Sequence, residues 1–276
     1  MSATSPQTSI AVTHFAGRAG DHNDRAMAAS PRLASALATR FTTPATVVGA
    51  PQPALATTWD AELGAAREDL SRMCAHYRSI LSRGLTPVTA LSRCAVALAT
   101  LPVIAEHHPD AVVLWFDAHA DINTPENTET GYLGGLALAG PLGLWDSGLG
   151  AGLAMEHTIL AGVRDIYPPG AGLLDTTELT LVAPGPDFGE RLGRAVDGRP
   201  VYIHIDCDVL DPGTVPTDYR VPGGLTLADL HDAATAVAGS RVVGIEIGQL
   251  ETATGEEDLA PLLDALEPEF AAIRGE

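Results

Sequence analysis

The 276-residue chain contains no lysine, so arginine supplies all 16 of its basic side chains. Against these stand 35 aspartates and glutamates, which gives a formal net charge of −19. A chain this acidic is a poor match for the phosphates of nucleic acids or for anionic membrane surfaces. Nucleic acid is therefore not expected as a partner. The charge favours cationic small molecules or metal ions, although surface acid also serves solubility.

Cysteine and long apolar runs are also scarce. The three cysteines (Cys74, Cys94 and Cys207) are odd in number, so no disulfide framework is predicted and a reducing interior is expected. The longest apolar run, residues 94–105, contains a proline and is too short to span a bilayer. The first residues lack the basic and apolar segments of a signal peptide. We expect a soluble, cytoplasmic protein without a membrane partner.

Charged residues make up only 18% of the chain and hydrophobic residues 46%. This balance fits a sheet covered by helices on both faces, and the length suits one large α/β domain over residues 1–276. The segments predicted as strands are 9–15, 46–49, 86–91, 112–116, 158–163, 178–183, 200–205 and 241–247. The segments predicted as helices are 23–41 (interrupted at Pro31), 58–83, 95–107, 188–196, 226–238 and 257–273. Their alternation predicts a parallel, doubly wound sheet.

Charged residues follow directly after the buried strand predicted at 112–116. Asp117, His119 and Asp121 occupy every second position, with alanines between them. In extended backbone, alternate residues share one face, so two carboxylates and an imidazole would converge. Adjacent carboxylates repel, and a divalent cation relieves that repulsion. The alternative for this segment alone is a solvated loop.

A second acidic cluster follows the strand predicted at 200–205. It contains Asp206, Asp208 and Asp211, and Cys207 points away from the first two. Ligands of α/β sheets bind at the carboxyl ends of strands, which would bring the two clusters together. The mixture of hard ligands suits Mn²⁺ better than structural zinc. Taken alone, Asp206 also fits a helix cap or a turn.

These segments resemble the two metal-binding signatures of the arginase/agmatinase (ureohydrolase) family. The signatures are DAHAD at 117–121 and DCDVLDP at 206–212, and GGLT at 223–226 and GIEIGQLE at 244–251 fall where the family has later motifs. The resemblance extends from about residue 86 onward. It implies a three-layer fold with a central, mostly parallel eight-stranded sheet, and a homo-oligomer is an option because family members are commonly trimers or hexamers. Nothing in the sequence marks an interface.

The resemblance also implies a site for two Mn²⁺ ions. Asp117 and Asp206 would bridge the ions, with Asp121 on one metal and His119 and Asp208 on the other. A hydroxide held between the metals would attack the guanidinium carbon of a small guanidino amino acid.

Where the family carries a histidine ligand upstream, this sequence has Cys94. A lone cysteine is more often a small buried hydrophobe, but the alignment favours a sixth metal ligand. A thiolate would make the metal less Lewis-acidic and the site oxidisable. Cys94 and the segments at 131–135 and 143–148 make the sequence resemble one branch of the family. Enzymes of that branch hydrolyse Nω-hydroxy-L-arginine to ornithine and hydroxyurea. That branch is associated with D-cycloserine biosynthesis, a form of antibiotic biosynthesis.

Two further departures concern catalysis. Gly134 stands where arginases place a proton-shuttle histidine, and Gln249 stands where they place a glutamate against the guanidinium. An N-hydroxyguanidine is far less basic than a guanidinium, so a neutral amide could serve it. The resemblance assigns the catalytic positions to Asp121, His119 and Gln249. A small shift in alignment would place a carboxylate there instead, from one of the glutamates that flank Gln249.

Substrate binding by the family maps onto Asn123 and Thr130, and onto Gln249 at the guanidine end. Asparagine and threonine are also ordinary loop residues. A family aspartate that helps to hold the α-amino group aligns with Tyr167, so Asp165 is a candidate replacement or a purely structural residue.

Three alternatives stay open. The chain could be a conventional arginase or agmatinase, or a metal-binding relative without activity. It could also be a one-zinc deacetylase, since a similar fold hosts that chemistry. A thiolate could favour a softer ion than manganese.

Overall fold

The computed structural model describes residues 10–166, 172–174, 177–252 and 258–276. Eight strands form one sheet in the order β2-β1-β3-β8-β7-β4-β5-β6. The strands are β1 (Ile10–Phe15), β2 (Thr46–Val48), β3 (Thr86–Ala90), β4 (Val112–Phe116), β5 (Thr158–Ala161), β6 (Thr180–Val182), β7 (Val201–Asp206) and β8 (Val242–Gly248). Every neighbouring pair is parallel. The predicted eight-stranded sheet is confirmed, and its described strands are wholly rather than mostly parallel.

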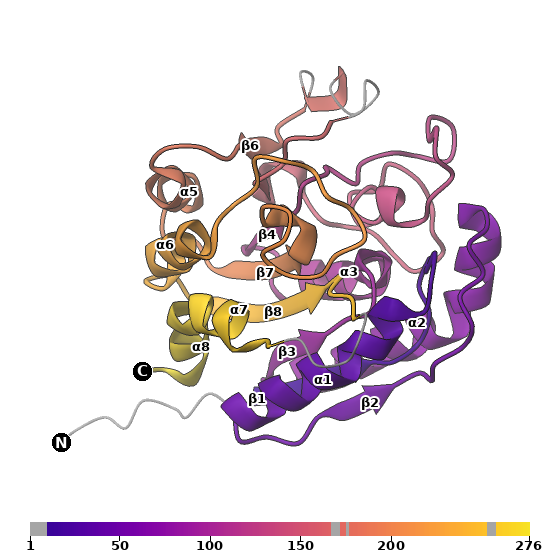
Figure 1. Cartoon of the computed structure of the whole chain (residues 1–276), viewed down its shortest axis with the longest axis horizontal. Coiled ribbons are helices and arrows are strands. Elements are labelled where there is room, and N and C mark those ends of the chain that lie inside the picture. The colour runs from indigo at the N-terminus through magenta and orange to yellow at the C-terminus, as the bar shows by residue number, and fades with distance from the viewer. Residues whose placement is uncertain (1–9, 167–171, 175–176, 253–257) are drawn as a thin grey trace.

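Helices cover both faces of this sheet. They are α1 (Arg25–Arg40), α2 (Trp59–Ser82), α3 (Ala97–His107), α5 (Phe188–Val196), α6 (Leu227–Val237), α7 (Ala260–Ala265) and α8 (Glu267–Arg274). Figure 1 shows α5, α6, α7 and α8 together on one side of the sheet and α2 and α3 on the other. Helix α1 packs on the first of these sides. The three-layer prediction is confirmed.

The central strand β4 shows why the sheet is covered twice. Val112, Leu114 and Phe116 belong to the core beneath α1, α5 and α6, whereas Val113 and Trp115 belong to the core beneath α2 and α3. All five side chains are fully buried. Burying each such side chain contributes roughly 1.5–3 kcal/mol, which is why a continuous apolar run is required here.

Helix α1 runs through Pro31, so the predicted interruption at this residue is wrong. Proline has no N–H with which to bond the carbonyl four residues back, that of Met27. The hydroxyl of Ser30 donates to the Met27 carbonyl instead, at 3.2 Å. A neighbouring side chain therefore replaces the missing backbone bond.

The other helices follow local signals. Thr226 and Asp229 form a capping box at the start of α6, the helix predicted at 226–238. The single helix predicted at 257–273 is wrong in its continuity, because the structure divides it at Leu266 into α7 and α8. Proline in the first turn of each piece favours a helix start over a helix interior. No helix in the described ranges is both long and apolar enough to cross a membrane.

The strand order collects the functional motifs. Strands β3, β8, β7, β4 and β5 are consecutive neighbours in the sheet. Their carboxyl ends lie at one edge and are followed by Cys94, Gln249, the second acidic cluster, the first acidic cluster and Asp165, respectively. Segments far apart in the sequence thus meet at one place.

Candidate metal centre and active site

The first acidic cluster begins where β4 ends. Asp117 is fully buried, and its carboxylate accepts hydrogen bonds from Trp115 Nε1 at 3.1 Å and from the backbone N–H of His119 at 2.7 Å. Asp121 adopts a left-handed backbone with φ of 50°. The extended backbone behind the prediction therefore does not continue to Asp121. Such a conformation costs an aspartate about 1 kcal/mol or more and is concentrated at functional sites.

The second acidic cluster is tied to the first by its side chains. Asp206 Oδ1 accepts the backbone N–H of Asp208 at 2.7 Å and so caps a short 3₁₀ helix, Cys207–Val209. Asp208 Oδ1 accepts the backbone N–H of Ala118 at 3.0 Å. The cap interpretation of Asp206 is correct, and it leaves the other carboxylate oxygen free for a second role. Cys207 lies in the apolar core, which agrees with the prediction that it points away from Asp206 and Asp208.

Cys94 lies at the same edge, in a short 3₁₀ helix after β3. Its side chain is fully buried, and Sγ donates to Asp206 Oδ2 at 3.0 Å. The thiol therefore faces the acidic cluster. Its apolar surroundings alone would have fitted a small core residue equally well.

Two overlapping sets of donor atoms result. One consists of Cys94, Asp117 and Asp206, and the other of Asp117, His119 and Asp208; within each set the atoms lie within 4.8 Å of one another. Asp117 belongs to both sets, the arrangement that a bridging carboxylate requires. Asp206 is in one set only. Asp121 is in neither set, although it lines a cavity together with His119, Asp206 and Asp208.

The electrostatics of the carboxylates call for a cation. Burial and the charge of Asp208 raise the pKa of Asp117 to about 6. Burial, followed by the charges of Asp208 and Asp117, raises the pKa of Asp206 well above its usual range. Burial and Asp117 have the same effect on the pKa of Asp121, and burial and Asp206 raise the pKa of the Cys94 thiol. Burial and mutual repulsion thus make ionisation of these groups costly, and bound divalent ions would remove that penalty.

His119 supplies part of the missing positive charge. Its Nδ1 atom lies 3.2 Å from both Asp117 Oδ1 and Asp208 Oδ2. Burial disfavours the imidazolium, but the contacts with Asp117 and Asp208 raise the pKa of His119 to about 12. Asp208 Oδ2 is buried. Among the described residues this oxygen has the ion pair with His119 but no hydrogen bond, and a buried carboxylate oxygen satisfied in this way fits a metal ligand. The residues therefore fit divalent cations.

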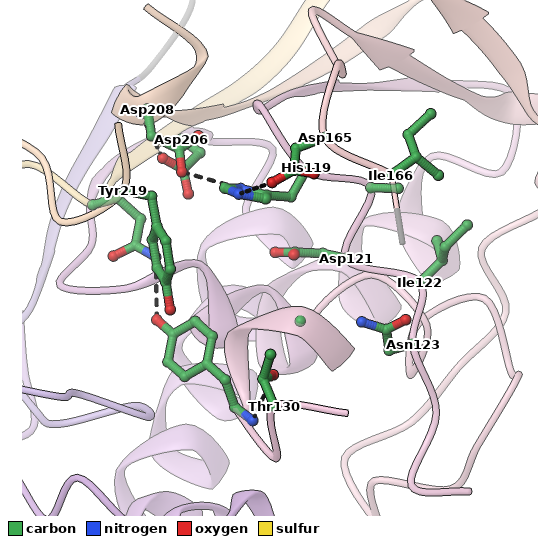
Figure 2. A pocket seen from close by; sticks show the side chains of 14 residues that line it. His119, Asp121, Ile122, Asn123, Thr130, Asp165, Ile166, Asp206, Asp208 and Tyr219 are labelled. Carbon is green, nitrogen blue, oxygen red and sulfur yellow. Dashed lines mark hydrogen bonds and ion pairs between the residues drawn. The ribbon is translucent and has the colours of Figure 1, made fainter. Parts of the chain in front are cut away.

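A cavity opens next to these clusters (Figure 2). It is lined by His119, Asp121, Asp206, Asp208, Asn123, Thr130, Asp165 and Gln249, together with residues that the motifs do not mark, such as Ile122, Tyr132, Ile166 and Tyr219. Asn123 and Thr130 lie apart from Asp206 and Asp208 in this view, with Asp121 between them. The positions expected to bind substrate and metal thus surround one cavity, and their roles stay predictions.

Gly134 is not part of the cavity lining, and its neighbour Tyr132 explains why. A Cβ atom built on Gly134 would lie 2.3 Å from the nearest ring atom of Tyr132. The tyrosine ring thus takes the space that a side chain at position 134 would need. Tyr132 also packs on His22, with ring centroids 4.3 Å apart. The family resemblance marks the segment 131–135 as a whole, but no feature of it singles out this tyrosine.

Gln249 lies at the end of β8 with its side chain buried and its backbone left-handed, at φ of 59°. The amide oxygen accepts from Arg93 Nη1 at 2.6 Å, and the amide nitrogen donates to the Tyr132 hydroxyl at 3.2 Å. Arg93 escaped prediction because charge usually indicates exposure. Its position beside Cys94 was the available signal.

The remaining predicted positions have varied surroundings. Asp165 lines the cavity, 3.9 Å from His119 Nε2. Asp211 is exposed and accepts the N–H groups of Gly223 and Gly224, so it organises a loop outside the cavity. Tyr167 lies outside the described residues.

The fold and site define a three-layer α/β protein with a candidate two-metal centre at the carboxyl edge of its sheet. A model of the arginase family matches residues 54–258. The chain is 41% identical over 261 residues to the Nω-hydroxy-L-arginine amidinohydrolase of Streptomyces lavendulae, which covers 93% of this chain and 95% of that one. The chain belongs to the arginase family.

Solved structures agree in fold. The arginase of Bacillus caldovelox is 28% identical over 199 residues, covering 66% of each chain. Its structure aligns with a TM-score of 0.79 over 98% of this chain and 99% of that one, at 20% identity. The arginase of Entamoeba histolytica aligns with the same TM-score at 18% identity, over 98% of this chain and 100% of that one.

Proposed function

We propose that the protein hydrolyses Nω-hydroxy-L-arginine to L-ornithine and hydroxyurea. The main support is the 41% sequence identity, over nearly the whole of both chains, to an Nω-hydroxy-L-arginine amidinohydrolase. The site supports this, because an amide, Gln249, stands in the cavity beside the acidic clusters. One water molecule is consumed, and the bond from the guanidino carbon to the ornithine nitrogen is broken.

Six residues would hold two divalent cations: Cys94, Asp117, His119, Asp121, Asp206 and Asp208. We propose Mn²⁺, because five of these six donors are carboxylates or imidazole. The bound cations would supply a water molecule of lowered pKa as the nucleophile. Asp117 is held by Trp115 and by the His119 backbone, so its orientation is set before a cation binds.

The far side of the cavity would hold the amino-acid end of the substrate. Asn123 and Thr130 offer neutral polar groups there. Asp165, which lines the cavity beside His119, offers a charge for an α-ammonium group. We extend the proposal to a cytoplasmic enzyme of antibiotic biosynthesis, in keeping with the resemblance and with three free, buried cysteines. A homo-oligomer is part of the same expectation.

The test is a comparison of initial rates on Nω-hydroxy-L-arginine, L-arginine and agmatine with the Mn²⁺-loaded protein, with hydroxyurea and urea measured separately. We expect the highest kcat/KM on Nω-hydroxy-L-arginine. Faster hydrolysis of arginine or agmatine would identify a conventional arginase or agmatinase. Absence of hydrolysis of all three, with excess Mn²⁺, would identify a metal-binding relative without this activity.

A further inference from the structure

We propose that Arg93 fixes the polarity of the Gln249 amide, so that Gln249 and Tyr132 present hydrogen-bond donors to the substrate and select the oxygen of an N-hydroxyguanidine. Arg93 is then a positioning residue, and Gln249 with Tyr132 determines specificity. This inference rests on the proposed function for its substrate and adds the element that distinguishes that substrate from arginine.

The contact with Arg93 sets the orientation of the Gln249 amide. A guanidinium group carries only donors, so the Gln249 atom 2.6 Å from Arg93 Nη1 must be the amide oxygen. Arg93 cannot turn away, because its fully buried side chain also donates to Asp21 at 3.2 Å and to Glu251 at 2.8 Å. The backbone N–H of Gln249 is held by the Ser92 carbonyl at 3.2 Å. The residue is thus anchored at both ends.

Gln249 and Tyr132 keep hydrogen-bond donors that can face the cavity. With its oxygen engaged, the amide turns its NH₂ group toward Tyr132, whose hydroxyl oxygen accepts one N–H at 3.2 Å. The hydroxyl hydrogen of Tyr132 and the second N–H of Gln249 are then available as donors. Both residues line the cavity. This wall therefore offers donors to a bound molecule.

The two candidate substrates differ in the hydrogen-bonding groups that they would present to Gln249 and Tyr132. A protonated guanidinium offers only N–H donors, so it would face this wall donor to donor. A buried donor left without an acceptor costs about 1–3 kcal/mol. The hydroxyl oxygen of an N-hydroxyguanidine is an acceptor and satisfies the wall. Sites built to bond a polar substrate group can reject a substrate that lacks it by factors of about 10⁴.

The decisive variant is Gln249→Glu. A carboxylate still accepts from Arg93, so that pair is kept, but the face toward the cavity becomes an acceptor. We expect the ratio of kcat/KM for Nω-hydroxy-L-arginine to that for L-arginine to fall by roughly 10-fold or more, with arginine hydrolysis rising. Gln52→Glu adds the same charge at an exposed residue outside the cavity and should leave the ratio unchanged. An unchanged ratio in Gln249→Glu would overturn the proposal.

Two further variants separate the parts of the wall. Tyr132→Phe removes one donor and should lower kcat/KM for Nω-hydroxy-L-arginine by about 3- to 10-fold, with arginine little affected. Equal losses on both substrates would contradict a role for the hydroxyl in selection. Arg93→Met frees the amide to rotate and should reduce the ratio, whereas Arg93→Lys retains a donor and should rescue it. A wild-type ratio in Arg93→Met would remove Arg93 as the positioning residue. If Arg93→Met does not fold, Gln249→Glu and Tyr132→Phe still decide the proposal.

Failure of the proposed function would be distinguishable. If neither amino acid is hydrolysed, turnover does not interfere with binding, and calorimetry on the Mn²⁺-loaded protein measures the preference directly. We then expect Nω-hydroxy-L-arginine to bind at least about 10-fold more tightly than L-arginine, and Gln249→Glu to narrow this difference. Equal affinities in the wild-type protein would overturn the inference.

Discussion

Two clusters of buried charge lie next to each other and are balanced differently. Arg93 belongs to one, with Asp21 and Glu251 as its partners, and Cys94, the next residue, belongs to the other. In the first cluster an arginine that is always charged faces the carboxylates. In the second, the nearest cationic side chain is that of His119, which faces several carboxylates.

The difference separates a structural cluster from a ligand-binding one. Asp21 and Glu251 have a permanent counter-charge from within the chain. Burial raises the pKa of Asp21, but the charge of Arg93 opposes that shift. In the second cluster, burial raises the pKa values of Asp117, Asp121 and Asp206, and the charges of neighbouring carboxylates raise them further. A buried cluster that the chain does not neutralise is suited to cations from solution. Removing charge from each cluster should therefore have different consequences.

The largest effect on stability is expected from Arg93→Met. It leaves the buried Asp21 without its counter-charge, which costs about 3–5 kcal/mol, whereas Glu251 keeps its ion pair with Arg25. Urea unfolding of the wild-type and variant proteins measures this loss. The matched control is Arg78→Met, whose ion pair with Glu106 is more than half exposed on both sides and should contribute less than about 1 kcal/mol. Similar losses in both variants would contradict the structural role of the first cluster.

The next effect concerns activity. Asp117→Asn removes the carboxylate that belongs to both donor sets, and it should lower kcat/KM by about 100-fold or more while the fold is kept. The same exchange at Asp211 provides the control. That exposed carboxylate accepts the backbone N–H groups of Gly223 and Gly224, and an amide oxygen can still accept them. We expect less than about a twofold change there. Equal losses would show that the second cluster is structural as well.

Within the described ranges, a third buried acidic group, Glu269, has neither an arginine partner nor a place among the candidate metal ligands. Glu269 is buried, and both carboxylate oxygens lack hydrogen-bond partners among the described residues. Burial raises its pKa from 4.5 to about 8. The unfolded chain therefore releases this proton at lower pH than the folded one, so the stability contribution is present below pH 4.5 and is lost as pH rises through 8.

The Glu269→Gln variant tests this smallest effect. Between pH 6 and pH 7 the wild-type free energy of unfolding should fall by about 1 kcal/mol more than that of the variant. Parallel pH dependence of the two proteins would show that Glu269 gains a partner that neutralises its burial.

Sequence reasoning reached the fold and the two acidic motifs because both depend on local patterns. The apolar run of β4 and the alternating charges after it are visible in consecutive residues. The hydrogen-bond donors of Gln249 and Tyr132, and their positioning by Arg93, could not be predicted from local patterns. Arg93 is buried only because three distant segments, those of Asp21, Asp218 and Gln249, supply its partners. Tyr132 likewise reaches Gln249 across 117 positions. The left-handed backbone of Asp121 likewise depends on the loop around it rather than on residue type.

The number of metal ions bound per chain distinguishes a two-metal site from a structural cluster of carboxylates. After equilibration with Mn²⁺ and removal of excess ion, elemental analysis of the wild-type protein should give two metal ions per chain, and Asp117→Asn should give one or none. Two ions in the wild-type protein, reduced in this variant but not in Asp211→Asn, would agree with the two-metal site. A single ion per wild-type chain, or none, would contradict it.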